Sequence, residues 1–127
     1  MNRSVKIRSF TDLRVWRKGH GLVLEIYSVT NDFPREELFG LTGQLRRASV
    51  SFTSNIAEGF SRKSYKDKIK FYFIALGSLT EVQNQLLVAR DLGYISVSEF
   101  NLLANRTVDL SKMTNGIIKK SRVILDS

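Results

Sequence analysis

Ten consecutive residues without a charge, residues 48–57, lie inside a segment with strong helix-forming character. They follow the basic pair Arg46 and Arg47, and the next charge is Glu58. A helix on the surface of a globular protein normally carries a charged face, because only one stripe of it is buried. A helix with so long an uncharged run is therefore expected to be contacted on more than one side. This pattern predicts a compact helical bundle that also assembles with copies of itself or with a partner.

The composition is that of one compact domain. Hydrophobic residues make up 43% of the 127 residues, which is enough for a single packed core. One proline and eight glycines are few helix breakers for this length, so long helices are favoured. We expect a single domain over residues 10–122, with frayed tails at residues 1–9 and 123–127.

Three features bear on the cellular location. The chain has no cysteine, so it has no disulfide framework and no thiolate metal site, which is compatible with a reducing cytosol. No uncharged apolar run approaches the roughly 20 residues of a membrane span. The basic N-terminus is not followed by the apolar region of a secretory signal. We therefore expect a cytoplasmic protein that does not contact a membrane.

Capping residues divide the chain into four predicted helices. The first begins near Thr11 or Asp12, either of which can cap backbone amides, and the second has Pro34 at its first helical position. Serines at capping-box spacing open the third helix at Ser64 and the fourth at Ser96. The short connections predict an all-α fold, an antiparallel up-down-up-down four-helix bundle.

The apolar spacing predicts which face of each helix is buried. On the first helix the apolar stripe includes Trp16, Tyr27 and the only histidine, His20. We therefore interpret His20 as a core residue rather than a general base. The predicted core stripe of the second helix is Leu38, Leu41, Leu45, Ala48, Phe52 and Ile56.

A second seam along the second helix is polar, but most of its side chains are small or uncharged. Either solvent or another helix covers this seam, and we favour another helix, because solvated faces usually carry Lys and Glu. Residues 71–80 of the third helix are also uncharged, and one small core cannot cover all of their faces. The predicted oligomer interface comprises Gln44, Ser51, Ser54, Asn55, Phe71 and Tyr72.

The charge balance is strongly basic. Lys and Arg number 20 against 12 Asp and Glu, a net charge of +8, which favours a polyanion such as nucleic acid or an acidic protein face. Two aromatic residues lie beside basic clusters: we interpret Trp16 as a packing residue and Tyr65 as the better platform for an unpaired base. The candidate nucleic-acid contacts are Arg14, Arg17, Lys18, Arg46, Arg47, Arg62, Lys63, Lys66, Lys119, Lys120 and Arg122. Arg46 and Arg47 either join the other contacts or are bound up in the bundle.

The sequence offers little for catalysis. One histidine cannot supply the two Glu-x-x-His pairs of a di-iron carboxylate bundle, and the phosphate-loop and nucleophile-elbow motifs are missing. We therefore predict no enzymatic activity, no metal and no cofactor. Arg47, Glu58 and Glu81 are interpreted as structural charge pairs, in which the two carboxylates bind Arg46, Arg47 or backbone groups of the bundle.

Two motifs give the chain a family resemblance. Residues 33–59 match FP-x-x-E-x-[FY]-G-L-x-x-Q-x-R-R-A…S…N-I-A-E-G, and residues 71–81 match F-x-x-x-A-x-G-S-x-x-E. Over about residues 9–120 the chain resembles the four-helix-bundle family of proteins encoded in 23S rRNA intervening sequences. The same family includes the accessory proteins of diversity-generating retroelements. The resemblance implies a bundle that assembles into a basic, barrel-like homopentamer, and in retroelement members it implies binding of nucleic acid and of the reverse transcriptase.

We therefore predict a non-enzymatic, homo-oligomeric nucleic-acid-binding protein. It would contact the phosphates of rRNA, of another RNA or of DNA, with little reading of the bases. The alternative is an oligomeric adaptor whose basic surface docks a protein partner without direct nucleic-acid binding.

Overall fold

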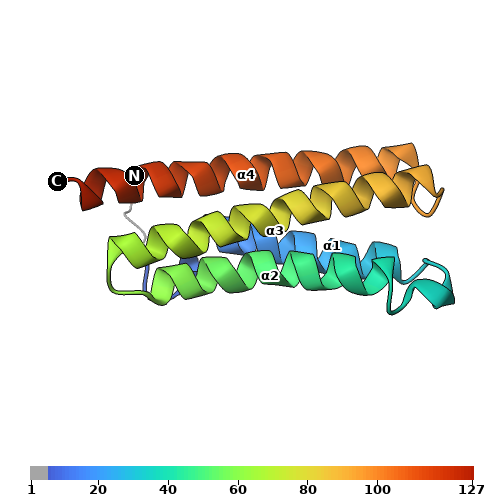
Figure 1. The fold of residues 1–127 in the computed structure, drawn as a ribbon, viewed down its shortest axis with the longest axis horizontal. Coiled ribbons are helices and arrows are strands. Elements are labelled where there is room, and N and C mark those ends of the chain that lie inside the picture. Colours follow the sequence, from blue (N-terminus) through green and yellow to red (C-terminus); the bar gives the residue numbers. More distant parts are fainter. Residues whose placement is uncertain (1–5) are drawn as a thin grey trace.

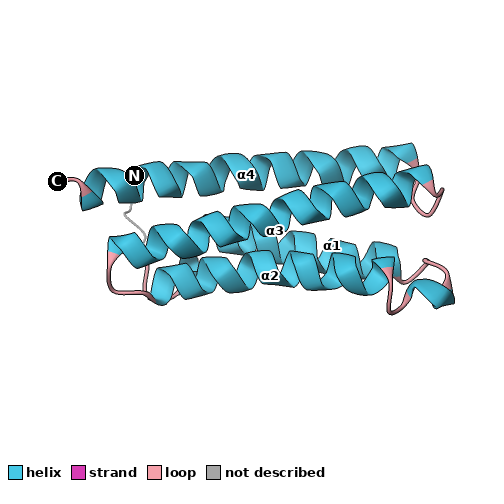
Figure 2. Ribbon diagram, in the orientation of Figure 1, coloured by secondary structure: helices cyan, strands magenta, loops and turns pink. Residues whose placement is uncertain are grey.

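The computed structural model describes residues 6–127, and most of them lie in four long helices (Figure 1, Figure 2). These helices are α1 (Arg14–Thr30), α2 (Leu41–Ser61), α3 (Tyr65–Asp91) and α4 (Val97–Leu125). Two short 3-10 helices, η1 (Phe10–Asp12) and η2 (Arg35–Glu37), precede α1 and α2. Successive helices run in opposite directions, and α4 closes the bundle by packing against α1 (Figure 1). The predicted all-α four-helix bundle is confirmed.

The core is built from one apolar stripe on each helix. Leu22 and Ile26 of α1 and Phe52 of α2 are each exposed by 1% or less. The stripe predicted for α2 is confirmed from Leu41 onwards, whereas Leu38 lies before the helix and is exposed. Within residues 6–127 no helix is long and apolar enough to cross a membrane.

The stripe predicted for α1 is confirmed only in part: Val23, at the same helical spacing, is buried, and Trp16 packs against the core. Val15 and Ile26 face the core, whereas His20 and Tyr27 are exposed. Trp16 is half-buried, and its ring is stacked on that of His20 with the centroids 4.8 Å apart. The buried residues and the exposed ones each recur at helical spacing along α1. Periodicity alone therefore does not show which of the two faces is buried. The interpretation of His20 as a core residue is therefore wrong.

The start of α1 also differs from the prediction. Neither Thr11 nor Asp12 caps this helix, because both belong to η1, and Leu13 occupies the N-cap without a side-chain bond. The Asp12 carboxylate instead accepts hydrogen bonds from the backbone amides of Arg8 and Ser9, at 2.9 and 3.1 Å. These two bonds hold the pKa of Asp12 below its usual value.

The start of α2 depends on Glu37 rather than on Pro34. Pro34 precedes η2, and α2 begins only at Leu41, whose amide donates to Glu37 Oε1 at 3.2 Å. The second carboxylate oxygen of Glu37 accepts a bond from the Tyr94 hydroxyl at 2.9 Å, and this bond raises the pKa of Tyr94. Glu37 thus caps α2 and ties it to the turn between α3 and α4.

The predicted starts of α3 and α4 are confirmed. Ser64 accepts from the Asp67 amide at 3.1 Å, and Ser96 accepts from the Glu99 amide at 3.0 Å. At the other end, α4 continues to Leu125, so the predicted tail at residues 123–127 is helical over its first part. The prediction of a frayed N-terminal tail falls largely on residues 1–5, which lie outside the described residues.

A glycine allows α2 and α3 to approach closely. A Cβ atom at Gly59 would lie 2.6 Å from the ring of Tyr72 and 3.2 Å from the carbonyl oxygen of Lys68. Tyr72 is only 4% exposed and has little room to move. We therefore expect Gly59→Ala to lower the free energy of unfolding by about 1–3 kcal/mol, measured by urea denaturation.

Gly77→Ala is the matched control for this prediction. A Cβ at Gly77, on the exposed face of α3, would meet no atom within 4 Å. Both variants gain the helix propensity of alanine. The difference between their free energies of unfolding therefore reports the close contact at Gly59 alone. Equal stability of the two variants would show that α2 and α3 do not need this close approach.

Candidate nucleic-acid interface

Three basic clusters that are separated in the sequence meet at one end of the bundle. The helices α1 and α3 begin at this end, and α2 and α4 finish there (Figure 1). We call this region the basic end. It presents the exposed side chains of Arg14, Arg17, Lys18, Arg62, Lys63, Lys66, Lys119, Lys120 and Arg122.

The opposite end of the bundle carries most of the acidic loop residues. Asp32, Glu36 and Glu37 lie between α1 and α2, and Asp91 and Glu99 flank the turn between α3 and α4. Because successive helices run in opposite directions, the α1–α2 and α3–α4 connections lie at this end and the α2–α3 connection lies at the basic end. The opposite end also carries Arg35, Arg47 and Arg90, so its charges largely cancel, and a polyanion is attracted more strongly to the basic end.

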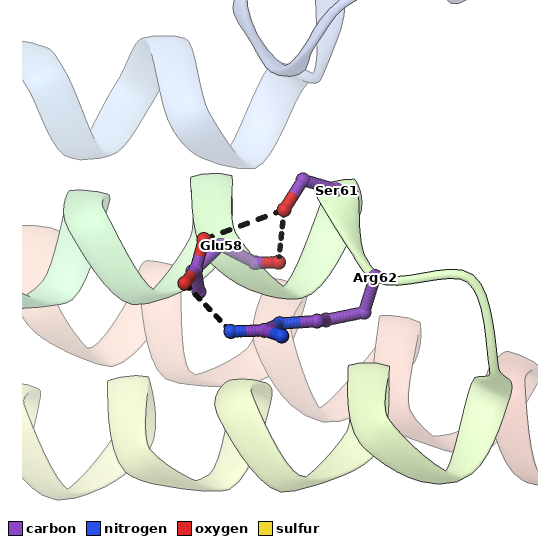
Figure 3. A network of polar contacts seen from close by, with 3 residues as sticks. All are labelled: Glu58, Ser61 and Arg62. Carbon is purple, nitrogen blue, oxygen red and sulfur yellow. Dashed lines mark hydrogen bonds and ion pairs between the residues drawn. The ribbon is translucent and has the colours of Figure 1, made fainter.

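Within the basic end, Arg62 is held in place by neighbouring side chains. Its guanidinium forms an ion pair with Glu58 at 2.8 Å (Figure 3). The same guanidinium lies 4.6 Å from the centre of the Phe71 ring. Ser61 Oγ also donates to the Glu58 carbonyl oxygen at 2.8 Å (Figure 3). Glu58 therefore pairs with Arg62 and not with Arg46 or Arg47, the two side-chain partners considered from the sequence. The side chains of the observed pair are 43% and 48% exposed, so it stabilises the fold by less than about 1 kcal/mol.

Arg46 and Arg47 do not join the basic end. Both lie near the start of α2, about 20 Å along the helix axis from its C-terminal end. Arg46 Nε donates to Thr30 Oγ1 at 2.9 Å, and its guanidinium lies 4.6 Å from the centre of the Tyr27 ring. Arg46 therefore links α2 to α1, while the exposed Arg47 faces a shallow hollow between α2 and α3.

The polar seam of α2 lies partly against α3. Ser51 Oγ is 2.9 Å from Ser78 Oγ, and Asn55 Nδ2 donates to the Ser51 carbonyl oxygen at 2.8 Å. Ser51 also lines the hollow next to Gln44 and Glu81. Glu81 is exposed and forms no ion pair among residues 6–127, so its role as a structural charge partner stays a prediction.

The remaining predicted interface residues divide between surface and core. Gln44 and Ser54 are exposed and can meet another molecule. Tyr72 is 4% exposed, and its ring packs against Gly59, so it is a core residue and not a surface for a second copy. Phe71 is half-buried beneath Arg62.

Lys68 is a basic residue outside the predicted contacts. Its Nζ donates to the Phe60 carbonyl oxygen at 2.6 Å, which satisfies an acceptor at the end of α2. The same ammonium lies 5.8 Å from the centre of the Tyr65 ring, and burial lowers the pKa of Lys68. Its position in the first turn of α3, directly after the end of α2, is the sequence signal for this capping role. Tyr65, the predicted stacking platform, is half-buried beside it.

A family model described as 23S rRNA-intervening sequence protein matches residues 11–116. The chain belongs to this family. Among solved structures, it is similar to a protein of unknown function from the S23 ribosomal protein family of Bacteroides thetaiotaomicron VPI-5482. The two are 24% identical with a TM-score of 0.74, over 83% of this chain and 98% of the other, which shows a shared fold. No curated protein matches the sequence.

Membership of the 23S rRNA-intervening sequence protein family confirms the resemblance carried by the two motifs. Several motif residues have structural roles in this chain. Glu37 caps α2, Arg46 links α2 to α1, and Ser51 contacts Ser78 across the interface of α2 with α3. These motif residues therefore hold the helices together. The residues that define the basic end lie outside the two motifs, residues 33–59 and 71–81.

Proposed function

We propose that this member of the 23S rRNA-intervening sequence protein family is a non-enzymatic, homo-oligomeric nucleic-acid-binding protein. The convergence of three basic clusters on one end of the bundle carries the proposal. The family description, with its link to rRNA, supports RNA as the first ligand class. DNA has the same phosphate backbone and is the second.

Binding would rest on lysine and arginine tips that reach phosphate oxygens. Such contacts position a nucleic acid without reading its sequence. In an oligomer each cluster is repeated by symmetry, so individually weak contacts reinforce one another through effective concentration. A homopentamer of the kind that the resemblance implies would present five copies of the basic end.

Anisotropy of labelled RNA and DNA of mixed sequence tests this proposal. We expect both to bind at low salt with similar affinity, because the contacts go to phosphates. If neither RNA nor DNA bound at low salt, nucleic acid would be rejected as the ligand.

A protein-docking role is favoured by one separate observation at the opposite end of the molecule. Phe39 is 90% exposed, and the neighbouring Leu38 is 47% exposed, just before α2. Exposed large apolar side chains that lie together are typical of protein contacts. An adaptor that bound no nucleic acid would use this surface, and the anisotropy experiment separates the two functions.

Self-assembly is the prediction that follows from the uncharged surfaces of α2 and α3. Val50 of α2 and Ile74 of α3 remain 39% and 45% exposed in the single chain. We expect light scattering after size exclusion to give a mass several times 14.5 kDa. Ser54→Glu should lower that mass, because it introduces a charge into the exposed seam of α2. A monomeric mass at micromolar concentration would contradict the prediction.

A further inference from the structure

Phe73 is an exposed aromatic residue that the core does not need. It lies on α3 and is 44% exposed, whereas its neighbour Tyr72 is buried. The guanidinium of Arg122, from the end of α4, lies 5.2 Å from the centre of the Phe73 ring. The contact between α3 and α4 therefore places an aromatic ring next to a cation on the surface.

Further cations surround this ring. Lys66 and Lys70 precede Phe73 by seven and three residues, so the three side chains share one face of α3 over about 10 Å. Lys119 precedes Arg122 by about one turn of α4. All four cations are exposed, and none of them takes part in an ion pair within the described part of the chain.

We propose that Phe73 is a stacking platform for an unpaired nucleobase, so that the ligand of the basic end is single-stranded nucleic acid. This inference deepens the proposed function and rests on it. The base lies on the Phe73 ring, and the flanking phosphates meet Lys66 and Lys70 on one side and Lys119 and Arg122 on the other. Stacking accepts any base, because every base has a π-face, which agrees with binding that reads little sequence.

The competing occupant of this surface is a second copy of the chain. The local charge favours nucleic acid, because Phe73 is surrounded by cations in a protein with a net charge of +8. A second copy that met Phe73 with this same cation-rich surface would be repelled, whereas a polyanion is attracted. Farther along α3, Leu87 and Val88 are also exposed but lie away from the basic end, and they remain available for contacts between copies.

Two labelled oligonucleotides with the same number of phosphates test the inference: an oligothymidylate and its abasic counterpart. The wild-type protein should bind the oligothymidylate about tenfold more tightly at the same salt, which is the size of effect that stacking one base produces. Phe73→Leu keeps the apolar volume but removes the aromatic face, so its two affinities should converge. Phe73→Trp should retain the preference.

Leu87→Ala is the matched control, because Leu87 lies on the same helix and is 41% exposed. It should keep the preference of the wild type for the oligothymidylate. Equal wild-type affinities for the two oligonucleotides would overturn the stacking platform and leave phosphate binding intact. A Phe73→Leu protein that kept the preference but changed its mass in light scattering would assign Phe73 to a contact between copies. Failure to bind either oligonucleotide would instead reject the proposed function.

Discussion

Phe52→Ala is expected to lower the free energy of unfolding by about 3–5 kcal/mol. Phe52 is fully buried at the centre of α2, and a Cβ at Gly19 of α1 would lie 2.6 Å from its ring. The neighbouring helix is therefore already in contact with the ring and can relax only partly into the cavity. Urea denaturation followed by circular dichroism measures the loss.

Phe39→Ala removes the same side chain from the surface and is the matched control. Phe39 is 90% exposed in the single chain, so its truncation should change stability by less than about 0.5 kcal/mol. A loss below about 1 kcal/mol for Phe52→Ala would contradict the packing described above. A loss for Phe39→Ala that grows with protein concentration would show that another copy covers this residue.

The elements of the fold that were predicted correctly depend on local chemistry. Ser64 and Ser96 bond to amides three residues later, and no distant residue is needed to recognise those caps. The buried stripe of α2 was also recognisable, because Phe52 and Ile56 have no competing apolar face. Long helices and short turns then leave few topologies other than an antiparallel bundle.

The parts of the fold that were missed depend on distant partners. The phase of α1 is decided by where α2 and α4 approach it, and this places Val15 inside and His20 outside. The start of α2 is fixed by Glu37, whose carboxylate is oriented by Tyr94. Tyr94 belongs to the turn between α3 and α4, far from Glu37 in the sequence. Nothing in the local sequence around Pro34 contains that information.

Lys63→Ser combined with Lys66→Ser is expected to weaken nucleic-acid binding by roughly 15- to 30-fold at physiological salt. This figure follows from two lost phosphate contacts, each of which contributes about 0.7–0.9 to the slope of log affinity against log salt. Both lysines are exposed at the basic end and form no ion pair within residues 6–127, so the fold should not change. Anisotropy measures the affinity, and circular dichroism checks the fold.

A control variant removes the same charge from elsewhere. Arg35→Ser combined with Arg47→Ser takes two positive charges from two exposed side chains at the other end of the bundle. If the basic end is the binding surface, this variant should lose only a few-fold in affinity through the change in net charge. Equal losses for the two variants would mean that overall charge, and not the basic end, controls binding.

The basic clusters and the antiparallel topology that gathers them were both predictable from the sequence, but the contacts of single side chains were not. The clusters around Arg17, Lys66 and Lys119 are visible in the sequence, but only the alternating helix directions bring them together. The sequence left two roles open for Arg46, because its partners Thr30 and Tyr27 belong to another helix. Phe73 was hidden inside an uncharged run, although its spacing from Lys66 and Lys70 places all three on one face of α3.

The salt dependence of wild-type binding to RNA and DNA of mixed sequence tests the central claim most directly. Phosphate contacts release counterions, so log affinity should fall linearly with log salt, by roughly 0.7–0.9 for each phosphate neutralised. Several cations act together at the basic end, so the predicted slope is steep, and it should be similar for unrelated sequences. An affinity that does not change with salt, or a slope that varies widely from one sequence to another, would contradict the account.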